Sequence, residues 1–318
     1  MKILFTGASG FIGSNMIQFY LDKNIEVLNI DKNEPKNKNQ ENIWQQVDIT
    51  NKTMLANCVT DFDPTHIIHL AARTDLDGKN MGDYASNTDG TLNLLEAATK
   101  LKNLKRILFT SSMLVCRPGY QPKSVTDFAP STIYGESKVD MEKLIRTQNP
   151  EFEWAIVRPT SIWGPGFGIP YRTFFDMVMS RKYFHIGKRA CVKTYGYIGN
   201  VVEQIDAILK APKEEINSRV FYLGDYEPTN IEDWANEIGV ELDIKIRTIP
   251  FSIIKLAALF GDFLKLSGFS FPMTSFRLKN MTTDNIIDLS DTQKLLPILP
   301  YSRIVGIRHT LDWLKQNQ

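Results

Sequence analysis

Hydrophobic and polar positions follow two alternating patterns over roughly the first half of the chain. Short apolar runs, typical of buried strands, are separated by longer stretches in which apolar residues recur at helical spacing. The runs predict strands at residues 3–5, 26–30, 44–47, 66–71, 106–110 and 154–157, and the stretches between them predict helices at about 11–23, 52–61, 84–101 and 134–148. This order predicts an α/β fold with a doubly wound parallel sheet, in which ligands gather at the carboxyl ends of the strands.

The first break in this pattern is a glycine-rich turn, KILFTGASGFIGS, at residues 2–14. We expect Gly7 to allow the turn, Gly10 to let the backbone approach a pyrophosphate, and Gly13 to let the new helix pack on the strand. The acidic residue that such a site needs, Asp31, ends the next apolar run. The segment therefore predicts a dinucleotide site of the Rossmann type; the alternative is a structural turn that binds nothing.

The strand ends also indicate which dinucleotide binds. The carboxylate of Asp31 can accept hydrogen bonds from both ribose hydroxyls and would repel a 2′-phosphate, which favours NAD over NADP. Asp48 ends the next strand and is expected to hold the adenine edge, although it could instead cap the helix that begins at Lys52. The following strand ends in two small side chains that let a cofactor pass close by, Ala71 and Ala72.

A tyrosine and a lysine four residues apart are the candidates for proton transfer. Tyr134 and Lys138 share one face of a predicted helix, so the ammonium can approach the phenol. An unperturbed tyrosine is a poor base at neutral pH, and a neighbouring cation would lower its pKa. Ser112 follows the fifth strand and can hold a substrate oxygen against the tyrosine. The alternative for Ser112 is an ordinary strand-end hydroxyl.

The alternation weakens beyond residue 160, where glycine and proline recur at 164–170. A last strand is predicted at 220–223, so the second region is interleaved with the first. We predict a Rossmann domain at 1–162, completed by about 193–224, and a smaller substrate-binding region formed by 163–192 and 225–318.

Charge and composition exclude several functions. The 37 basic and 36 acidic residues among 318 nearly balance, so neither nucleic acid nor an anionic membrane is an expected partner. The three cysteines are scattered and odd in number, which indicates a reducing compartment, the cytoplasm. With four histidines and no metal-binding spacing of cysteines, we expect no metal site. The apolar stretch 251–266 is too short and too charged to span a bilayer. It predicts a buried or amphipathic helix, with a membrane-surface or partner contact as the alternative.

Six segments resemble the extended short-chain dehydrogenases/reductases, and among them the NAD-dependent epimerase/dehydratase family that acts on nucleotide sugars. They are TGASGFIG at 6–13, HLAA at 69–72, NTDGTLNLLEAA at 87–98, FTSSMLV at 109–115, YGESK at 134–138 and RPTSIWGPG at 158–166. The resemblance is strong over about residues 1–166. It is weaker beyond, where KTYGYIGNVVEQ at 193–204 is similar to the family's substrate-domain segment.

The resemblance implies a role for particular residues. It implies catalysis by Ser112, Tyr134 and Lys138. It implies NAD contacts from Gly7, Gly10, Phe11, Ile12, Gly13, Asp31, Asp48, Ile49, Ala71, Ala72, Lys138 and Pro159. Ser161 and Lys193 correspond to family positions that touch the substrate. Arg73, which follows a strand end, and Arg277 are further candidate substrate contacts; for Lys193 and Arg277 the alternative is a solvated surface side chain. The helices near 84–101 and 134–148 would form the interface of a homodimer.

Departures from the family pattern concern the substrate. Nucleotide-sugar members commonly carry asparagine in place of Ser161 and arginine in place of Lys193, which lacks the bidentate fork of a guanidinium. Dehydratases carry an Asp-Glu pair where this chain has Met113 and Leu114, so dehydration is disfavoured.

The leading interpretation is therefore an NAD-dependent nucleotide-sugar epimerase of polysaccharide biosynthesis. Tyr134 would remove a hydroxyl proton while hydride moves to NAD, and the hydride would return to the other face of a keto intermediate. The alternative is an NAD-dependent dehydrogenase or reductase of a sugar or hydroxysteroid-like alcohol, which fits the apolar stretch 251–271. A catalytically inactive NAD sensor is a third possibility.

Overall fold

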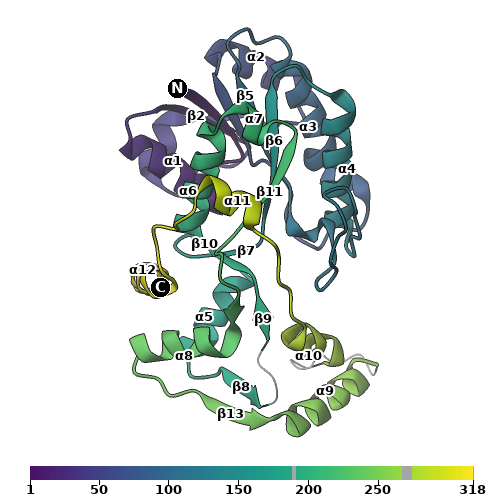
Figure 1. Cartoon of the computed structure of the whole chain (residues 1–318), viewed down its shortest axis with the longest axis vertical. Helices are drawn as coiled ribbons and strands as arrows, with labels where there is room; N and C mark the ends of the chain where they lie inside the picture. The colour runs from purple at the N-terminus through teal and green to yellow at the C-terminus, as the bar shows by residue number, and fades with distance from the viewer. Residues whose placement is uncertain (188–190, 267–273, 318) are drawn as a thin grey trace.

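The computed structural model describes residues 1–187, 191–266 and 274–317. Its centre is a seven-stranded parallel sheet in the order β11-β6-β5-β4-β1-β2-β3 (Figure 1). The strands are β1 (Lys2–Thr6), β2 (Glu26–Asp31), β3 (Trp44–Gln46), β4 (His66–His69), β5 (Arg106–Thr110), β6 (Glu153–Pro159) and β11 (Arg219–Leu223). The predicted doubly wound sheet is confirmed, including the late strand that returns to its edge.

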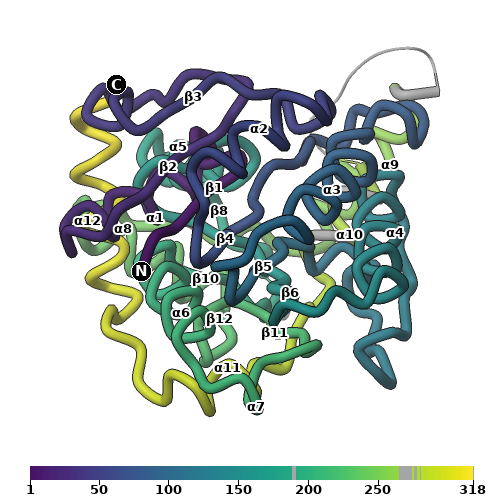
Figure 2. Tube along the Cα trace, turned by 90° about the horizontal axis from the view of Figure 1, so that it is seen from above, coloured from purple at the N-terminus to yellow at the C-terminus, as the bar shows by residue number. Residues whose placement is uncertain are grey.

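Helices cover both faces of the sheet. Figure 2 shows α3 and α4 on one side of it and α1 and α6 on the other. The covering helices are α1 (Phe11–Asp22), α2 (Lys52–Phe62), α3 (Ala85–Ala98), α4 (Ile133–Gln148) and α6 (Ile198–Lys210). The first four agree with the predicted helices to within three residues at each end.

The alternation of side chains along β1 explains the two layers. Successive residues of a strand point to opposite faces. Ile3 and Phe5 accordingly pack into the core on the side of α1 and α6, whereas Leu4 packs into the core on the side of α2 and α3. All three side chains are fully buried. A strand that is apolar on both faces is typical of a parallel sheet covered by helices.

The parallel register brings the strand ends to one edge of the sheet. Thr6 of β1 pairs with Ile30 of β2 on one side and with His69 of β4 on the other. Thr110 of β5 pairs with Val157 of β6. Asp31, Ala71 and Ser112 follow these positions, so the residues predicted to bind ligand share this edge.

Much of the rest of the chain forms a region below this edge in Figure 1. Its small two-stranded sheets pair β7 with β10, β9 with β12 and β8 with β13. Their strands are β7 (Ser161–Trp163), β8 (Phe184–Gly187), β9 (Val192–Lys193), β10 (Tyr195–Tyr197), β12 (Thr229–Asn230) and β13 (Arg247–Pro250). The remaining α-helices are α5 (Tyr171–Met179), α7 (Lys213–Ile216), α8 (Ile231–Glu241), α9 (Phe251–Leu266), α10 (Ser275–Thr282), α11 (Ser290–Leu295) and α12 (Arg303–Gln316), and the 3₁₀ turns are η1 (Lys38–Ile43), η2 (Met81–Tyr84) and η3 (Met113–Val115).

Aromatic packing stabilises this lower region. The ring of Trp234 on α8 lies 5.0 Å from that of Trp163 and 4.7 Å from that of Phe174, centroid to centroid. β11 and α6 carry the chain back to the sheet between Ile198 and Leu223, as the sequence pattern indicates. The domain limits themselves stay a prediction. Among the described residues, no helix is long and apolar enough to cross a membrane.

Candidate active site

The glycine-rich turn joins β1 to α1 and fits closely against the end of β4. Gly7 has a φ of +73°, in the left-handed region that favours glycine. A Cβ atom on Gly7 would lie 2.4 Å from the Cα atom of Ala71. A Cβ atom on Gly13 would lie 2.2 Å from the Cα atom of Ala8, so the first turn of α1 also needs glycine. Both contacts hold the turn directly beside the strand ends.

The N-terminus of α1 opens toward the space in front of this turn. Gly10 precedes the helix and provides no side-chain cap. The first N–H groups of a helix lack partners within it, and with the helix dipole they attract an anion. The nearest atom to a Cβ on Gly10 would be the carbonyl oxygen of Gly7, 3.4 Å away. The backbone therefore offers N–H groups and room to a phosphate.

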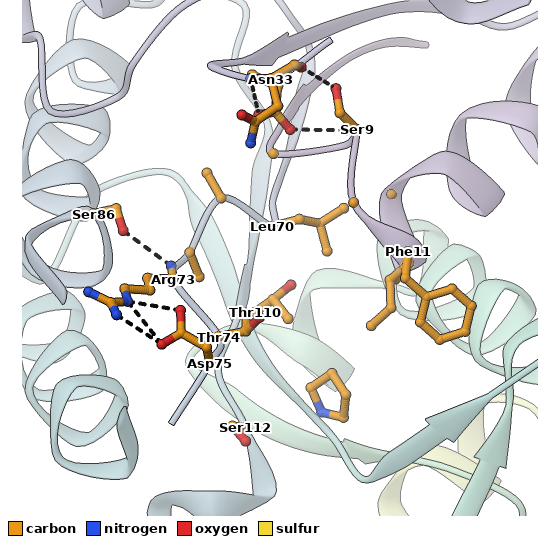
Figure 3. Close-up of a pocket in the computed structure, with 18 of the residues that line it drawn as sticks. Ser9, Phe11, Asn33, Leu70, Arg73, Thr74, Asp75, Ser86, Thr110 and Ser112 are labelled. Atoms are coloured by element: carbon orange, nitrogen blue, oxygen red, sulfur yellow. Dashed lines mark hydrogen bonds and ion pairs between the residues drawn. The ribbon is translucent and has the colours of Figure 1, made fainter. Parts of the chain in front are cut away.

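Asp31 is held beside the turn by two backbone donors. Its Oδ2 atom accepts a hydrogen bond from the N–H of Ser9 at 3.0 Å, and its Oδ1 atom accepts one from the N–H of Asn33 at 2.9 Å. Figure 3 shows Ser9 and Asn33 together at one end of the site. A carboxylate has about four acceptor positions, so each oxygen keeps capacity for a further donor such as a ribose hydroxyl.

Asp48 lies at the same end of the site, after β3. Its Oδ1 atom accepts hydrogen bonds from the N–H of Thr50 at 2.9 Å and from the Thr50 hydroxyl at 2.8 Å. The pKa of Asp48 is lowered, mainly because its carboxylate accepts the hydrogen bond from the Thr50 backbone. The alternative in which Asp48 caps α2 is wrong, because the side chain of Asn51 accepts from the N–H of Met54 and occupies the cap position.

Ser112 and Tyr134 meet on the opposite wall. Ser112 follows β5, and its hydroxyl accepts a hydrogen bond from the N–H of Leu114 at 3.1 Å. Tyr134 lies in the first turn of α4, which is capped by the side chain of Thr132. Burial raises the pKa of Tyr134 to about 12, and a hydrogen bond with Ser112 opposes that increase. The two hydroxyls are therefore in position to act on one substrate oxygen.

Lys138 lies one helical turn after Tyr134 and is buried. Its Nζ atom donates a hydrogen bond to the carbonyl oxygen of Thr110 at 2.8 Å. Burial lowers the pKa of Lys138 to about 7, and the charge of Glu142 opposes this decrease. The expectation that a neighbouring cation lowers the pKa of Tyr134 is not what the structure gives, since burial dominates and the ammonium is directed to the end of β5.

One cavity of about 1120 Å³ connects these groups. Asp31 and Asp48 line one end, and Ser112 and Tyr134 line the other. Figure 3 places Phe11 on one wall and Thr110 near Ser112. Every residue predicted to contact NAD lines this cavity, namely Gly7, Gly10, Phe11, Ile12, Gly13, Asp31, Asp48, Ile49, Ala71, Ala72, Lys138 and Pro159.

Two buried hydroxyls in the cavity wall support a ligand-binding role. Within the described part of the chain, the side-chain oxygens of Thr110 and Ser111 are buried without a hydrogen-bond partner. Buried polar atoms without a hydrogen-bond partner are uncommon in native proteins, and a bound ligand can supply the missing partner. With the close-fitting turn and the helix N-terminus, they make the cavity suitable for a dinucleotide.

Comparison with known families agrees with this geometry. The model of the NAD dependent epimerase/dehydratase family matches residues 3–224. The chain belongs to this family. The protein is thus an NAD-dependent enzyme of the extended short-chain dehydrogenase/reductase type, and the match covers the whole sheet from β1 to β11.

Individual relatives extend the comparison to the full length. The N-acetyl-alpha-D-glucosaminyl-diphospho-ditrans,octacis-undecaprenol 4-epimerase of Escherichia coli O157:H7 is 27% identical over 320 residues, which span 98% of this chain and 95% of that protein. A 3-beta-hydroxysteroid dehydrogenase of Mycolicibacterium neoaurum is 27% identical and spans 79% of this chain and 73% of that protein. The solved UDP-glucose 4-epimerase of Thermotoga maritima has the same fold, with a TM-score of 0.77 at 18% identity and coverage of 100% and 99%.

Arg73 lines the part of the cavity next to the catalytic end but is already paired. Its guanidinium donates to both carboxylate oxygens of Asp75, with the shortest distance 2.8 Å (Figure 3). The guanidinium also lies over the ring of Tyr84. The pair neutralises the charge of Arg73. A role in holding an anionic substrate group therefore requires Arg73 to exchange Asp75 for the substrate.

The other predicted substrate residues are less directly placed. Ser161 is buried in β7 and does not belong to the cavity lining, because the hydroxyl of Tyr171 donates to its Oγ atom at 3.0 Å. Lys193 lies in β9, paired with Thr229 of β12, and is also outside the lining of this cavity. The side chain of Arg277 lies outside the described residues.

Two residues at the site were missed by the sequence analysis. Tyr171 lines the cavity and is close enough to Tyr134 to affect its pKa. Asn87 is fully buried, accepts from the N–H of Arg73 at 2.8 Å and donates to the hydroxyl of Ser137 at 2.8 Å. The motif NTDGTLNLLEAA contains Asn87, and an asparagine on the apolar side of a predicted helix was the available signal. In the described part of the chain, no cluster of three metal-binding side chains is found.

Proposed function

We propose that this protein is an epimerase that inverts carbon 4 of a sugar carried on a diphosphate, with a nucleotide sugar as the first candidate substrate. The observation that carries the proposal is the single cavity that joins the glycine-rich turn to Ser112, Tyr134 and Lys138. The match to a sugar 4-epimerase over 98% of the chain supports the sugar and the carbon.

In the proposed mechanism, Tyr134 takes the proton from the sugar hydroxyl, and Ser112 donates a hydrogen bond to the same oxygen as it becomes a carbonyl. Bound NAD would supply reversible uptake of the hydride from the sugar carbon. Tyr134 gives its proton back when the hydride returns to the other face of the keto sugar. Protons and electrons balance, so the reaction needs no external oxidant.

Lys138 supplies the positive charge in this scheme. Burial outweighs this charge at Tyr134, so the ammonium would act together with the positively charged nicotinamide of bound NAD to favour the phenolate. Its Nζ atom is fixed by the Thr110 carbonyl, so the charge is held in one place before substrate binds. The residues that would hold NAD are those of the glycine-rich turn, with Asp31 at the ribose and Asp48 at the adenine.

A polyprenol diphosphate sugar is the second candidate substrate. The relative that matches nearly the whole chain carries a polyprenol in its name. The hydroxyl of Tyr171 also donates a hydrogen bond to Ser161, which stands where nucleotide-sugar members commonly carry asparagine. Both observations favour a carrier that does not need the usual nucleotide contact.

A dehydrogenase of a hydroxysteroid-like alcohol is less well supported. The steroid dehydrogenase relative is matched over only 73% of its length. The same Ser112, Tyr134 and Lys138 would serve that reaction, so catalytic residues do not separate the two proposals. Retention of NAD does, because only a redox-neutral reaction can keep its cofactor bound from one turnover to the next.

We also propose a cytoplasmic homodimer that supplies sugars to polysaccharide biosynthesis. The three cysteines are buried, which suits a reducing compartment. The family resemblance assigns the interface to α3 and α4. Their outward positions include Asp89, Glu136 and Asp140, which are exposed in the single chain. Light scattering of the purified protein tests the dimer, and Asp140→Arg should weaken it.

The experiment that tests the function is a thermal-shift panel on the NAD-loaded protein. The panel contains UDP, GDP and TDP sugars, a polyprenol diphosphate sugar, sterols and simple alcohols. A ligand at about 100 times its dissociation constant stabilises the folded state by about 2.7 kcal/mol. Stabilisation by a diphosphate sugar supports the proposal and names the carrier. A response to sterols or alcohols alone would replace it with the dehydrogenase.

A further inference from the structure

Helix α9 buries one side against the lower region of the molecule. Its Ile254 and Ala258 form a small core with Leu278 of α10, with Ile186 of β8 and Ile249 of β13 packed against them. Burial of this one side is sufficient to anchor an amphipathic helix. The opposite side would then be expected to be polar.

The opposite side of α9 is instead apolar. Five large side chains on it are exposed: Ile253 at 56%, Leu256 at 70%, Leu259 at 53%, Phe260 at 54% and Phe263 at 65%. Their spacing of three and four residues places them on one face of the helix. Single exposed apolar residues are ordinary, but a contiguous apolar face marks an interaction surface. We call this set the α9 face.

Positive charge is concentrated around the α9 face. Residues 245–279 contain six of the 37 basic residues of the chain and one of its 36 acidic residues. The described, exposed cations of this segment are Lys245, Arg247, Lys255 and Lys279. The near-zero charge of the whole chain, which argues against an anionic membrane, conceals this local excess. An apolar helix face in a segment rich in exposed lysine and arginine is complementary to an anionic lipid surface.

Helix α9 itself lies in the lower region of the molecule. Figure 1 shows α9 and α10 at the end of the molecule remote from the helices that cover the sheet. The chain leaving α10 reaches the cavity within three residues, because Asn285 accepts from the N–H of Gly119 at 2.9 Å and its Nδ2 atom lies 3.9 Å from the sulfur of Met113. Met113 lines the catalytic cavity.

We propose that the α9 face is a docking surface for an anionic lipid bilayer. The helix would lie in the plane of the surface, with its apolar side chains among the acyl chains and its cations at the headgroups. The catalytic cavity would then face the membrane from close by. The inference stands on the surface alone and does not depend on the proposed reaction.

The test is co-sedimentation of the full-length protein with vesicles. Vesicles of phosphatidylcholine alone are compared with vesicles that also contain phosphatidylglycerol, at low and high salt. We expect binding that requires phosphatidylglycerol and weakens with salt. The double variant Leu256→Glu/Leu259→Glu should bind at least tenfold more weakly. Lys255→Glu should lose about fivefold or more, the effect of one charge at an anionic surface.

The matched control is Ile298→Glu, which changes an equally exposed side chain, at 82%, away from α9. It should bind vesicles like the unmodified protein. All of these side chains are exposed, so the variants should keep their melting temperatures; Lys255→Glu tests the proposal even if the double variant does not fold.

Three results would overturn the proposal. The first is failure of the unmodified protein to sediment with phosphatidylglycerol vesicles at low salt. The second is equal binding by the double variant and the unmodified protein. The third is a dimer that the double variant converts to a monomer in the absence of vesicles, which would assign the α9 face to a second copy of the chain.

Discussion

The Nζ atom of Lys138 donates a hydrogen bond to the carbonyl oxygen of Thr110 over 2.8 Å. This contact fixes the buried ammonium at the end of β5, one helical turn from Tyr134. Burial lowers the pKa of Lys138 to about 7 and raises that of Tyr134 to about 12. Lys138 is therefore the one of the two groups that loses its proton near pH 7.

This pair predicts how activity depends on pH. Below about pH 7 both groups are protonated, and neither can accept the proton of a sugar hydroxyl. Above it Lys138 is a neutral amine that can accept the proton of Tyr134, which makes the phenolate available as a base. We expect kcat/KM to rise about tenfold per pH unit below 7 and to level off above it. A profile that falls as pH rises through 7 would contradict this pairing.

Substitution of the lysine should move that profile. In Lys138→Met Tyr134 loses this proton acceptor, so the rise in kcat/KM should shift toward the pKa of Tyr134, about 12. Activity at pH 8 should fall by about 10³-fold or more, within the range for general-base catalysis. Lys143→Met, at an exposed position of the same helix, is the control and should keep the original profile.

The hydroxyl of Ser112 should contribute to kcat more than to substrate binding. Removing one donor to a developing carbonyl oxygen typically costs about 10²- to 10³-fold in kcat. Ser112→Ala should show this loss, whereas Ser124→Ala, at an exposed serine, should not. Steady-state kinetics with separate kcat and KM values provide the measurement. A change confined to KM would mean that Ser112 only positions substrate.

Asp31 should determine affinity for NAD. In Asp31→Asn one of the two backbone donors, from Ser9 or Asn33, loses its acceptor, and the ribose loses a charged one. A hydrogen bond to a charged group contributes about 1.5–3 kcal/mol, so the dissociation constant for NAD should rise about 10- to 100-fold. Calorimetry measures this, with Asp22→Asn at the exposed end of α1 as the control. An unchanged constant would remove Asp31 from the cofactor site.

A buried ion pair should stabilise the fold behind the site. Glu142 on α4 is fully buried and accepts from Arg158 of β6 at 2.7 and 2.8 Å. Breaking a buried pair leaves an uncompensated charge, so Glu142→Gln should lower the free energy of unfolding by about 3–5 kcal/mol. Glu136→Gln, exposed on the same helix, should change it little. Equal urea denaturation midpoints for the two variants would contradict this role.

The sheet and the cofactor half of the site follow from local sequence patterns. Alternating apolar runs and helical spacing predict β1 to β6 because each element is long enough to show its period. The glycine-rich turn can be predicted because Gly7 and Gly13 stand where a Cβ atom would collide with Ala71 of the neighbouring strand end and with Ala8. The spacing of Tyr134 and Lys138 places both on one helix face.

The substrate half was less predictable because its contacts are between residues far apart or in short elements. Nothing local shows that the hydroxyl of Tyr171 donates to that of Ser161. The strands β9 and β12 have two residues each, too few to show any period. The pKa values of Tyr134 and Lys138 depend on burial, which the whole fold determines and spacing does not reveal.

The most direct test of the account follows a deuterium at carbon 4 of a diphosphate-linked hexose, with NAD-loaded protein and no added cofactor. The account predicts the 4-epimer with its deuterium retained at carbon 4 and no reduced NAD released into solution. Release of reduced NAD in proportion to a ketone product would contradict the epimerase and identify a net dehydrogenase.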